Sequence, residues 1–331
     1  FDRETGQQQK SSSARTYTRV FGDWLCDMAR SDSKLAGITP AMREGSGLVE
    51  FAERFPERYF DVGIAEQHAV TYAAGLAAEN MRPVICMYST FLQRAYDQVV
   101  HDVATQNLPV TFCIDRGGLV AEDGTTHHGA FDFAYLRHMP NMVVMAPKDE
   151  NELQHMVQTG LVHDGPTAIR YPRASSLGVP LDPNPIPLEI GQGELLVEGR
   201  DVAILAIGVT VSEAMKAAEQ LQEDGVSVAV INARFVKPLD KDLIREVAKN
   251  VKCLVTVEEG CRMGGFGSAV LEFLSEEECW DLPTKVIGLP DWYIEQGPQE
   301  LLRQKYGLTA DGIYDQTKAL YDQVSLKTIL R

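Results

Sequence analysis

The stretch Asp61-Val-Gly-Ile-Ala-Glu-Gln-His-Ala-Val70 decides the fold of this chain. It ends an apolar run typical of a strand and then begins a helix of small residues, with Glu66 at the corner. In α/β proteins, ligands bind at the carboxyl ends of strands, and a carboxyl group there can hold a proton for a bound heterocycle. The alternative is that Glu66 only compensates the dipole of its helix. The stretch predicts an α/β fold with a candidate site at Glu66.

The composition of the chain limits the classes of protein to which it can belong. Its 331 residues, 44% of them hydrophobic, suffice for two folded domains. The net charge of −16 disfavours binding to nucleic acid or to an anionic membrane. No apolar stretch has the length of a membrane span, and the polar segment from Phe1 to Arg15 does not resemble a signal peptide. The six cysteines form no CxxC pair, so we expect a soluble, intracellular protein with reduced thiols.

From Thr16 onward, short β-branched runs alternate with longer amphipathic ones, which predicts βα units around a parallel sheet. We expect a disordered segment or linker at residues 1–15, a first domain at 16–178, a proline-rich linker at 179–195 and a smaller α/β domain at 196–331. The predicted strands are Leu35 to Thr39, Tyr59 to Gly63, Pro83 to Tyr88, Pro109 to Asp115, Met142 to Ala146, Thr167 to Tyr171, Val202 to Ile207, Val226 to Asn232, Cys253 to Glu258 and Lys285 to Gly288.

Aromatic and cationic residues follow the predicted strands of the first domain. Phe91 could stack on a flat ring, and Arg94 could bind an anion. Arg116 follows the fourth strand and Arg173 follows the sixth. Ordinary packing would also explain Phe91, and solvation would explain Arg94. Three arginines expected on one rim, in a chain this acidic, nevertheless indicate a phosphate site.

A polar loop, Glu122-Asp-Gly-Thr-Thr-His-His-Gly129, comes soon after the fourth strand. Asp123 and His127 could act as an acid/base pair or bind a sugar phosphate. The alternative is a surface turn stabilised by Asp-Gly. The histidines lack an HExxH or paired Cys/His spacing, so we assign no metal to the chain.

These motifs together resemble the thiamine-diphosphate-dependent transketolase superfamily and, within it, the 1-deoxy-D-xylulose-5-phosphate synthase family. The resemblance extends from about Thr16 to about Leu320. The motifs that carry it are Tyr59-Phe-Asp-Val-Gly-Ile-Ala-Glu-Gln-His68, Tyr88-Ser-Thr-Phe-Leu-Gln-Arg94, Asp115-Arg116, Asp123-Gly-Thr-Thr-His127, Arg170-Tyr-Pro-Arg173, Arg234-Phe-Val-Lys-Pro-Leu239 and Gly288-Leu-Pro-Asp291.

The resemblance implies a pyrimidine-binding thiamine-diphosphate-type domain with a parallel sheet, followed by a smaller transketolase C-terminal α/β domain. It implies that Glu66 hydrogen-bonds N1′ of the aminopyrimidine of thiamine diphosphate and that Phe91 stacks on that ring. Ile64 and Arg94 are the other cofactor contacts it implies.

The resemblance also implies the residues that bind substrate. Arg116 and Arg173 would hold the phosphate of the acceptor. Tyr88, Arg94, Asp123 and His127 would orient the donor or move protons, and Glu66, Asp123 and His127 would be catalytic. His127 is preferred to His128 because it matches the Asp-Gly-x-Thr-His order of the family.

The implied activity is that of a transferase. Pyruvate would lose CO2, and its two-carbon unit would pass to D-glyceraldehyde 3-phosphate, giving 1-deoxy-D-xylulose 5-phosphate for isoprenoid, thiamine and pyridoxal synthesis. We expect no flavin. The expected location is the bacterial cytoplasm or, in a eukaryote, the plastid stroma, and the expected assembly is a homodimer.

One departure from the family pattern concerns the other end of the cofactor. The Gly-Asp-Gly motif and following Asn that hold the diphosphate and Mg²⁺ in this superfamily do not occur in the chain. Since Phe1-Asp-Arg-Glu-Thr-Gly6 resembles the segment that follows the domain carrying them, we expect an amino-terminal half as partner. The chain alone would then supply half of an active site.

Three other interpretations stay open. The β subunit of a 2-oxoacid dehydrogenase E1 component has a similar length and domain order, but it is not expected to carry Asp123-Gly-Thr-Thr-His127 together with Arg173. A split transketolase would share the cofactor chemistry. A noncatalytic transketolase-like binding module would not need to keep Glu66, Phe91 and the arginines.

Overall fold

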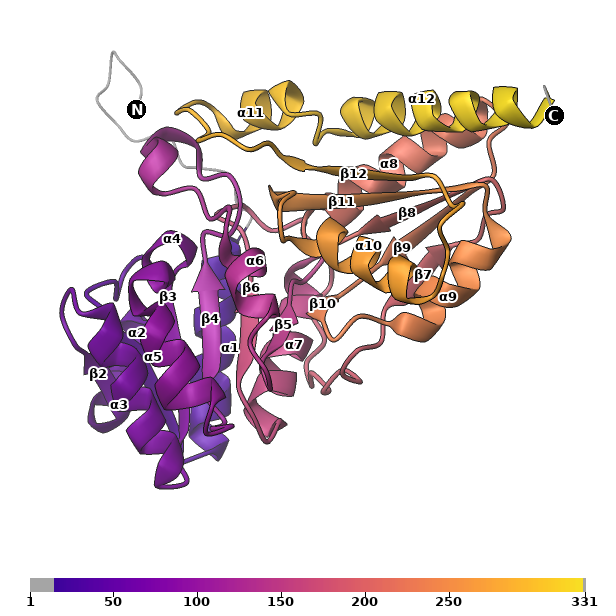
Figure 1. Cartoon of the computed structure of the whole chain (residues 1–331). Helices are drawn as coiled ribbons and strands as arrows, with labels where there is room; N and C mark the ends of the chain where they lie inside the picture. Colours follow the sequence, from indigo (N-terminus) through magenta and orange to yellow (C-terminus); the bar gives the residue numbers. More distant parts are fainter. Residues whose placement is uncertain (1–14, 330–331) are drawn as a thin grey trace, which may run out of the picture.

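The computed structural model describes residues 15–329, and the segment predicted to be disordered lies outside the described residues except for Arg15. Two sheets lie side by side in Figure 1, and helices cover both faces of each. The predicted α/β fold with mostly parallel sheets is confirmed.

The first sheet has seven strands in the order β10-β5-β6-β4-β3-β1-β2. All neighbouring pairs are parallel except β10 with β5, so the carboxyl ends of β1, β3, β4 and β6 meet at one edge. The strands are β1 (Leu35–Thr39), β2 (Tyr59–Asp61), β3 (Arg82–Tyr88), β4 (Thr111–Asp115), β5 (Val143–Met145), β6 (Thr167–Arg170) and β10 (Phe235–Lys237).

Alternation along the strands of this sheet divides its apolar side chains between two faces. Ile85 and Met87 pack with α3, whereas Val84 and Cys86 pack in a second cluster with α1 and α7. The helices and turns of this part are α1 (Tyr17–Ser31), α2 (Val49–Arg54), η1 (Pro56–Arg58), α3 (Glu66–Ala78), α4 (Ser89–Leu92), η2 (Gln93–Ala95), α5 (Tyr96–Gln98), η3 (Val99–Ala104), η4 (Ala121–Thr126), α6 (Asp132–Arg137) and α7 (Glu150–Val162).

The second sheet has five strands in the order β12-β11-β8-β9-β7, of which only the β7–β9 pair is antiparallel. Ile204 packs with α8 and α12, whereas its neighbour Leu205 packs with α9 and α10. The elements are β7 (Glu194–Val197), β8 (Val202–Ala206), α8 (Thr210–Glu223), β9 (Val228–Asn232), α9 (Lys241–Asn250), β11 (Cys253–Cys261), α10 (Phe266–Glu276), β12 (Thr284–Leu289), α11 (Gln299–Lys305) and α12 (Ala310–Ile329).

Two short strands were not among the predicted ones. β7 starts at Glu194, inside the range predicted as linker, and it is a half-exposed edge strand with little hydrophobic alternation. β10 follows the predicted strand that ends at Asn232, yet it pairs with β5 of the first sheet. A three-residue run has too little periodicity to be recognised, and no local pattern shows which sheet a strand joins.

A buried carboxylate secures the crossing of the chain between the sheets. Glu152 of α7 is 4% exposed. It accepts hydrogen bonds from Nε of Arg234 at 2.7 Å, Nδ2 of Asn232 at 2.9 Å and the backbone N–H of Lys148 at 2.7 Å. Arg234 also donates to Glu194 at 3.1 Å. The Arg234 motif is therefore a structural junction between β9, β7 and the first domain.

A second buried carboxylate, Glu258 of β11, supports the start of α10. Its two oxygens accept the backbone N–H groups of Phe266 and Gly267, each at 2.8 Å. Burial nevertheless dominates and raises the pKa of Glu258 from 4.5 to about 7. Because the pKa is higher in the folded state, the folded protein binds this proton more tightly than the unfolded chain does. The stability that the protonated carboxyl group provides is complete below about pH 4.5 and is lost as the pH rises through about 7.

We predict that Glu258→Gln flattens the dependence of the free energy of unfolding on pH. Wild-type protein should lose up to about 3 kcal/mol more than the variant between about pH 5 and pH 8, because only wild type must ionise a buried carboxyl group. Urea denaturation at a series of pH values measures the difference. The control is Glu276→Gln on the exposed end of α10, which should keep the wild-type slope; equal slopes for all three proteins would contradict the prediction.

Candidate active site

Glu66 is the first residue of α3 and is 2% exposed. The turn before it is held by Asp61, whose Oδ1 accepts the backbone N–H groups of Ala41 at 2.9 Å and Gly63 at 3.0 Å. Oε2 of Glu66 accepts a hydrogen bond from Nη1 of Arg94 at 2.8 Å. A carboxyl group that only compensated the helix dipole would need neither burial nor an arginine from another element. Glu66 is therefore built into the interior of the site.

An aromatic wall, formed by Tyr88, Phe91 and His127, lies where β3 continues into α4. The ring of Phe91 stacks on Tyr88, with centroids 5.7 Å apart and planes at 23°. His127 approaches the same Phe91 ring edge-on at 5.4 Å. Thr90 donates a hydrogen bond to the carbonyl of Thr126 at 2.9 Å, which ties α4 to the polar loop. The structure therefore brings Phe91 and His127 together, as expected if both serve one site.

Two of the three predicted rim arginines share one carboxylate. Oδ2 of Asp123 accepts hydrogen bonds from Nη1 of Arg116 at 2.5 Å and from Nη1 of Arg173 at 2.8 Å. The Arg116 guanidinium also lies 3.9 Å above the ring of Tyr88. The third, Arg94, contacts Glu66 instead. Arg173 also lies 3.9 Å from the Glu122 carboxylate, so two guanidinium groups and two carboxylates meet at this rim. A bound phosphate would have to replace these carboxylates as the partner of the arginines.

The backbone of Arg116 adopts a left-handed conformation with φ of 59°, which is uncommon for a side chain of this size. Asp115 compensates for it: Oδ1 accepts the Arg116 backbone N–H at 2.6 Å, and Oδ2 accepts the hydroxyl of Thr18 at 2.6 Å. Burial raises the pKa of Asp115 to about 6. Sequence reasoning gave Asp115 no role of its own, because only the fold shows that it is buried beneath the arginine that follows it.

Ile64 lies in the turn two residues before Glu66, and 80% of its surface is exposed. An aliphatic side chain this open, beside a buried carboxyl group, is available to a partner or ligand. Its expected contact with a cofactor stays a prediction.

The two adjacent histidines of the loop have different environments. His128 is 5% exposed; Nδ1 accepts the backbone N–H of Val120 at 3.1 Å, and Nε2 lies 3.1 Å from the carbonyl of Glu295 in the second domain. His127 is half-buried and contacts Thr126 and Phe91. His128 is therefore structural, which leaves His127 as the histidine that faces the aromatic wall.

Other features of residues 15–329 bear on the kind of site. No group of three or more His, Cys, Asp or Glu side chains in this range is arranged to hold a metal ion. Within the same range, no helix combines the length and hydrophobicity needed to cross a membrane.

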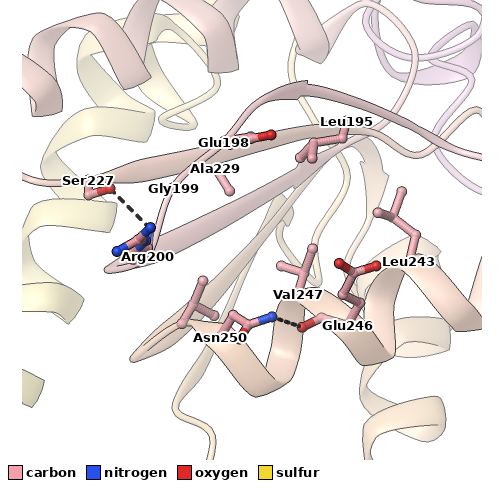
Figure 2. Close-up of a pocket in the computed structure, with 11 residues that line it drawn as sticks. Leu195, Glu198, Gly199, Arg200, Ser227, Ala229, Leu243, Glu246, Val247 and Asn250 are labelled. Atoms are coloured by element: carbon pink, nitrogen blue, oxygen red, sulfur yellow. Dashed lines mark hydrogen bonds between the residues drawn. The ribbon is translucent and has the colours of Figure 1, made fainter.

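A pocket of about 490 Å³ lies in the second domain, between α9 and the β7–β9 edge. Figure 2 shows Leu243 and Val247 of α9 facing Leu195 and Ala229. None of its lining residues is a candidate site residue, and its polar groups do not converge on one point. This pocket therefore lies apart from the candidate residues, which gather at the edge of the first sheet.

Comparison with known proteins agrees with this geometry. The model of the transketolase pyrimidine-binding domain matches residues 13–177, and the model of the transketolase C-terminal domain matches residues 191–313. A solved structure described as a split gene transketolase, inactive beta4 tetramer, is 31% identical, with a TM-score of 0.82, and is covered over 98% of its length by 94% of this chain. The chain belongs to the transketolase family.

The curated relatives are more specific. The 1-deoxy-D-xylulose-5-phosphate synthase 1 of Geobacter sulfurreducens is 57% identical over 96% of this chain and 50% of its own length. The 1-deoxy-D-xylulose-5-phosphate synthase of Aquifex aeolicus is 56% identical over 94% of this chain and 49% of its own length. The predicted resemblance to this synthase family is confirmed. The chain spans about half the length of these relatives. A transketolase structure from Campylobacter jejuni, 18% identical with a TM-score of 0.77, supports the fold alone.

We predict that His127→Ala and His128→Ala affect stability differently. His128→Ala should lower the free energy of unfolding by about 2 kcal/mol, because it leaves a buried backbone N–H and a carbonyl without their partner. His127→Ala should change it by no more than about 0.5 kcal/mol, because the ring of His127 faces the site. Urea denaturation of the two variants checks this; equal losses would contradict the assignment of His128 as structural.

Proposed function

We propose that the chain supplies the pyrimidine-binding half of the active site of a 1-deoxy-D-xylulose-5-phosphate synthase. The enzyme would decarboxylate pyruvate and transfer the two-carbon unit to D-glyceraldehyde 3-phosphate, releasing CO2. The observation that carries the proposal is the buried carboxyl group of Glu66 beside an aromatic wall, in a chain 57% identical to such a synthase.

The side chains at the edge of the first sheet suit the aminopyrimidine of thiamine diphosphate. Among the described residues, the hydrogen bond of Glu66 engages Oε2, which leaves Oε1 to accept a proton shared with N1′ of the ring. Phe91 offers a flat apolar surface, and Ile64 and Arg94 would complete the contacts. When bound, the cofactor supplies a nucleophilic carbon and an electron sink for the decarboxylation. Its diphosphate and Mg²⁺ are proposed to bind to the half of the synthase that this chain does not match.

The rim on the other side of Phe91 suits the substrates. The phosphate of glyceraldehyde 3-phosphate would compete with Asp123 for Arg116 and Arg173, whose forked donors match a phosphate group. Asp123 and His127 would orient the substrates or move protons. His127 is suited to this because imidazole changes its charge near neutral pH and because it contacts Phe91.

Tyr88 would serve the same rim by orienting Arg116 through its ring, and Arg94 by orienting Glu66. The further proposals follow the family: a homodimer, a second half that binds the diphosphate, a cytoplasmic or plastid location, and products used for isoprenoids and thiamine.

Two alternative enzymes remain to be tested against this proposal. A split transketolase would use a ketose phosphate as donor, and a 2-oxoacid dehydrogenase E1 β subunit would pass its two-carbon unit to a lipoyl group. The 31% identity to a split gene transketolase is well below the 57% identity to a synthase. That difference favours the synthase, and the retained site residues favour it over a noncatalytic module.

We predict that this chain turns over pyruvate and glyceraldehyde 3-phosphate only together with a diphosphate-binding half. The test mixes it with the half of the Geobacter sulfurreducens relative that it does not match, and adds thiamine diphosphate and Mg²⁺. This mixture is called the reconstituted enzyme below. Product should form with both polypeptides and negligibly with either alone. Robust turnover by residues 1–331 alone, or transfer only to a lipoyl domain or from a ketose phosphate, would refute the proposal.

We predict that Glu66→Gln lowers kcat of the reconstituted enzyme by about 100-fold or more, because an amide cannot share a proton with N1′ as a carboxyl group does. The matched control is Glu79→Gln, at the other end of the same helix and exposed to solvent, which should retain wild-type kcat. Steady-state kinetics with both substrates measures the effect. Unchanged turnover in Glu66→Gln would overturn the assignment of Glu66.

A further inference from the structure

A buried ion pair lies directly behind the site. Asp132, the first residue of α6, is fully buried, and Arg170, the last residue of β6, is 4% exposed. Nε of Arg170 donates to Oδ2 of Asp132 at 3.0 Å, and Oδ1 of Asp132 accepts the backbone N–H of Phe133 at 2.8 Å. The Arg170 guanidinium also lies 4.4 Å above the ring of Phe133. The pair is therefore buried and held from several sides.

The ion pair binds three segments that are far apart in the sequence. Ser89, the first residue of α4, donates its hydroxyl hydrogen to Oδ2 of Asp132 at 2.7 Å. Nη2 of Arg170 donates to the carbonyl of Gly129, where the polar loop closes, at 2.9 Å. It also donates to the carbonyl of Glu259 in the second domain at 2.6 Å. One buried charge pair therefore joins α4, the polar loop and β11.

The start of the polar region at Gly117 and Gly118 is packed directly against Arg170 and Glu259, with no room for a side chain on either glycine. A Cβ atom on Gly117 would lie 2.3 Å from Nε of Arg170, and one on Gly118, which has a positive φ of 82°, would lie 2.3 Å from Oε1 of Glu259. That oxygen in turn accepts the backbone N–H of Leu119 at 2.9 Å. The second domain therefore holds the root of the loop directly.

Ser89 is the link between this pair and the aromatic wall. It is 2% exposed and lies two residues before Phe91 on the same short helix. The Asp132–Arg170 pair touches neither Phe91 nor His127, but it holds the segments that carry them. Their 5.4 Å contact therefore depends on how α4 and the loop are anchored to the same two side chains.

We infer that Ser89 is a positioning residue. Through Asp132 and Arg170 it sets the Phe91 ring against His127 and so aligns the bound pyrimidine with the groups that move protons. The inference rests on the proposed synthase function and extends it to residues that do not contact substrate or cofactor.

The test is Ser89→Ala in the reconstituted enzyme, because this change removes one hydroxyl group and leaves the buried ion pair intact. Asp132→Asn would instead leave Arg170 without its counter-charge and could prevent folding. The matched control is Thr167→Val, which removes a buried hydroxyl group without a hydrogen-bond partner from β6 of the same sheet. Three quantities are measured: the melting temperature, kcat with KM for glyceraldehyde 3-phosphate, and Kd for thiamine diphosphate by calorimetry.

Positioning predicts that Ser89→Ala lowers kcat about tenfold and weakens thiamine diphosphate binding several-fold, while KM for glyceraldehyde 3-phosphate stays within about twofold. KM should change less than kcat because Arg116 and Arg173 form their hydrogen bonds with Asp123 and not with Ser89. The melting temperature of Ser89→Ala should lie several degrees below that of Thr167→Val, because only Ser89 donates a hydrogen bond to a buried carboxylate. The kinetics of Thr167→Val should equal wild type, and kcat of Ser89→Ala is compared per folded enzyme.

Two results would overturn the inference alone: wild-type kcat and Kd in Ser89→Ala, or a lower melting temperature with unchanged kcat per folded enzyme. Absence of turnover in the wild-type reconstituted enzyme would instead overturn the proposed function, and this inference with it.

Discussion

Both domains and the candidate site depend on how the guanidinium group of Arg170 is bound in the interior. It pairs with the carboxylate of Asp132. It also donates hydrogen bonds to the carbonyl of Gly129, at the end of the polar loop, and to the carbonyl of Glu259 in the second domain. In a buried environment neither charge can be removed alone without leaving the other unpaired, which typically costs about 3–5 kcal/mol. The two sheets are thus joined at the place where the candidate residues gather. The second domain has a structural role at the site, because its residues hold the loop that carries Asp123 and His127.

The site also has to overcome the charge of the protein that carries it. A net charge of −16 repels anionic substrates at long range, so attraction must come from cations at the rim. Arg116 and Arg173 are the proposed source of this attraction, and Asp123 holds both guanidinium groups in one place. The shared carboxylate reduces the electrostatic repulsion between the two guanidinium groups. Beneath them, the buried Asp115 carboxyl group and the Thr18 hydroxyl keep Arg116 in its unusual backbone conformation.

Local patterns were enough to place most strands and the candidate residues. The apolar runs located every described strand except β7 and β10, because strands buried on two faces are continuously apolar and end abruptly. Parallel strands have their carboxyl ends at one edge, so Glu66, Phe91, Arg116 and Arg173 could be grouped before any contact was known. The same reasoning could not place β10, since a short strand contributed by one domain to the sheet of the other leaves no local signal.

The sequence by itself determined the α/β class, the edge on which the polar residues lie and the resemblance to the transketolase superfamily, since all three follow from short-range order along the chain. Only the tertiary structure decided which arginines act together. Arg94 and Arg116 are both motif residues, yet one pairs with Glu66 and the other with Asp123. It also showed that His128, which the motif order had already ranked below His127, is a buried structural residue, and that Ser89, Asp132 and Arg170 form one buried unit. The physical reason is that the burial of a side chain and its hydrogen-bond partners depend on segments that are distant in the sequence. The local sequence around one residue therefore does not determine them.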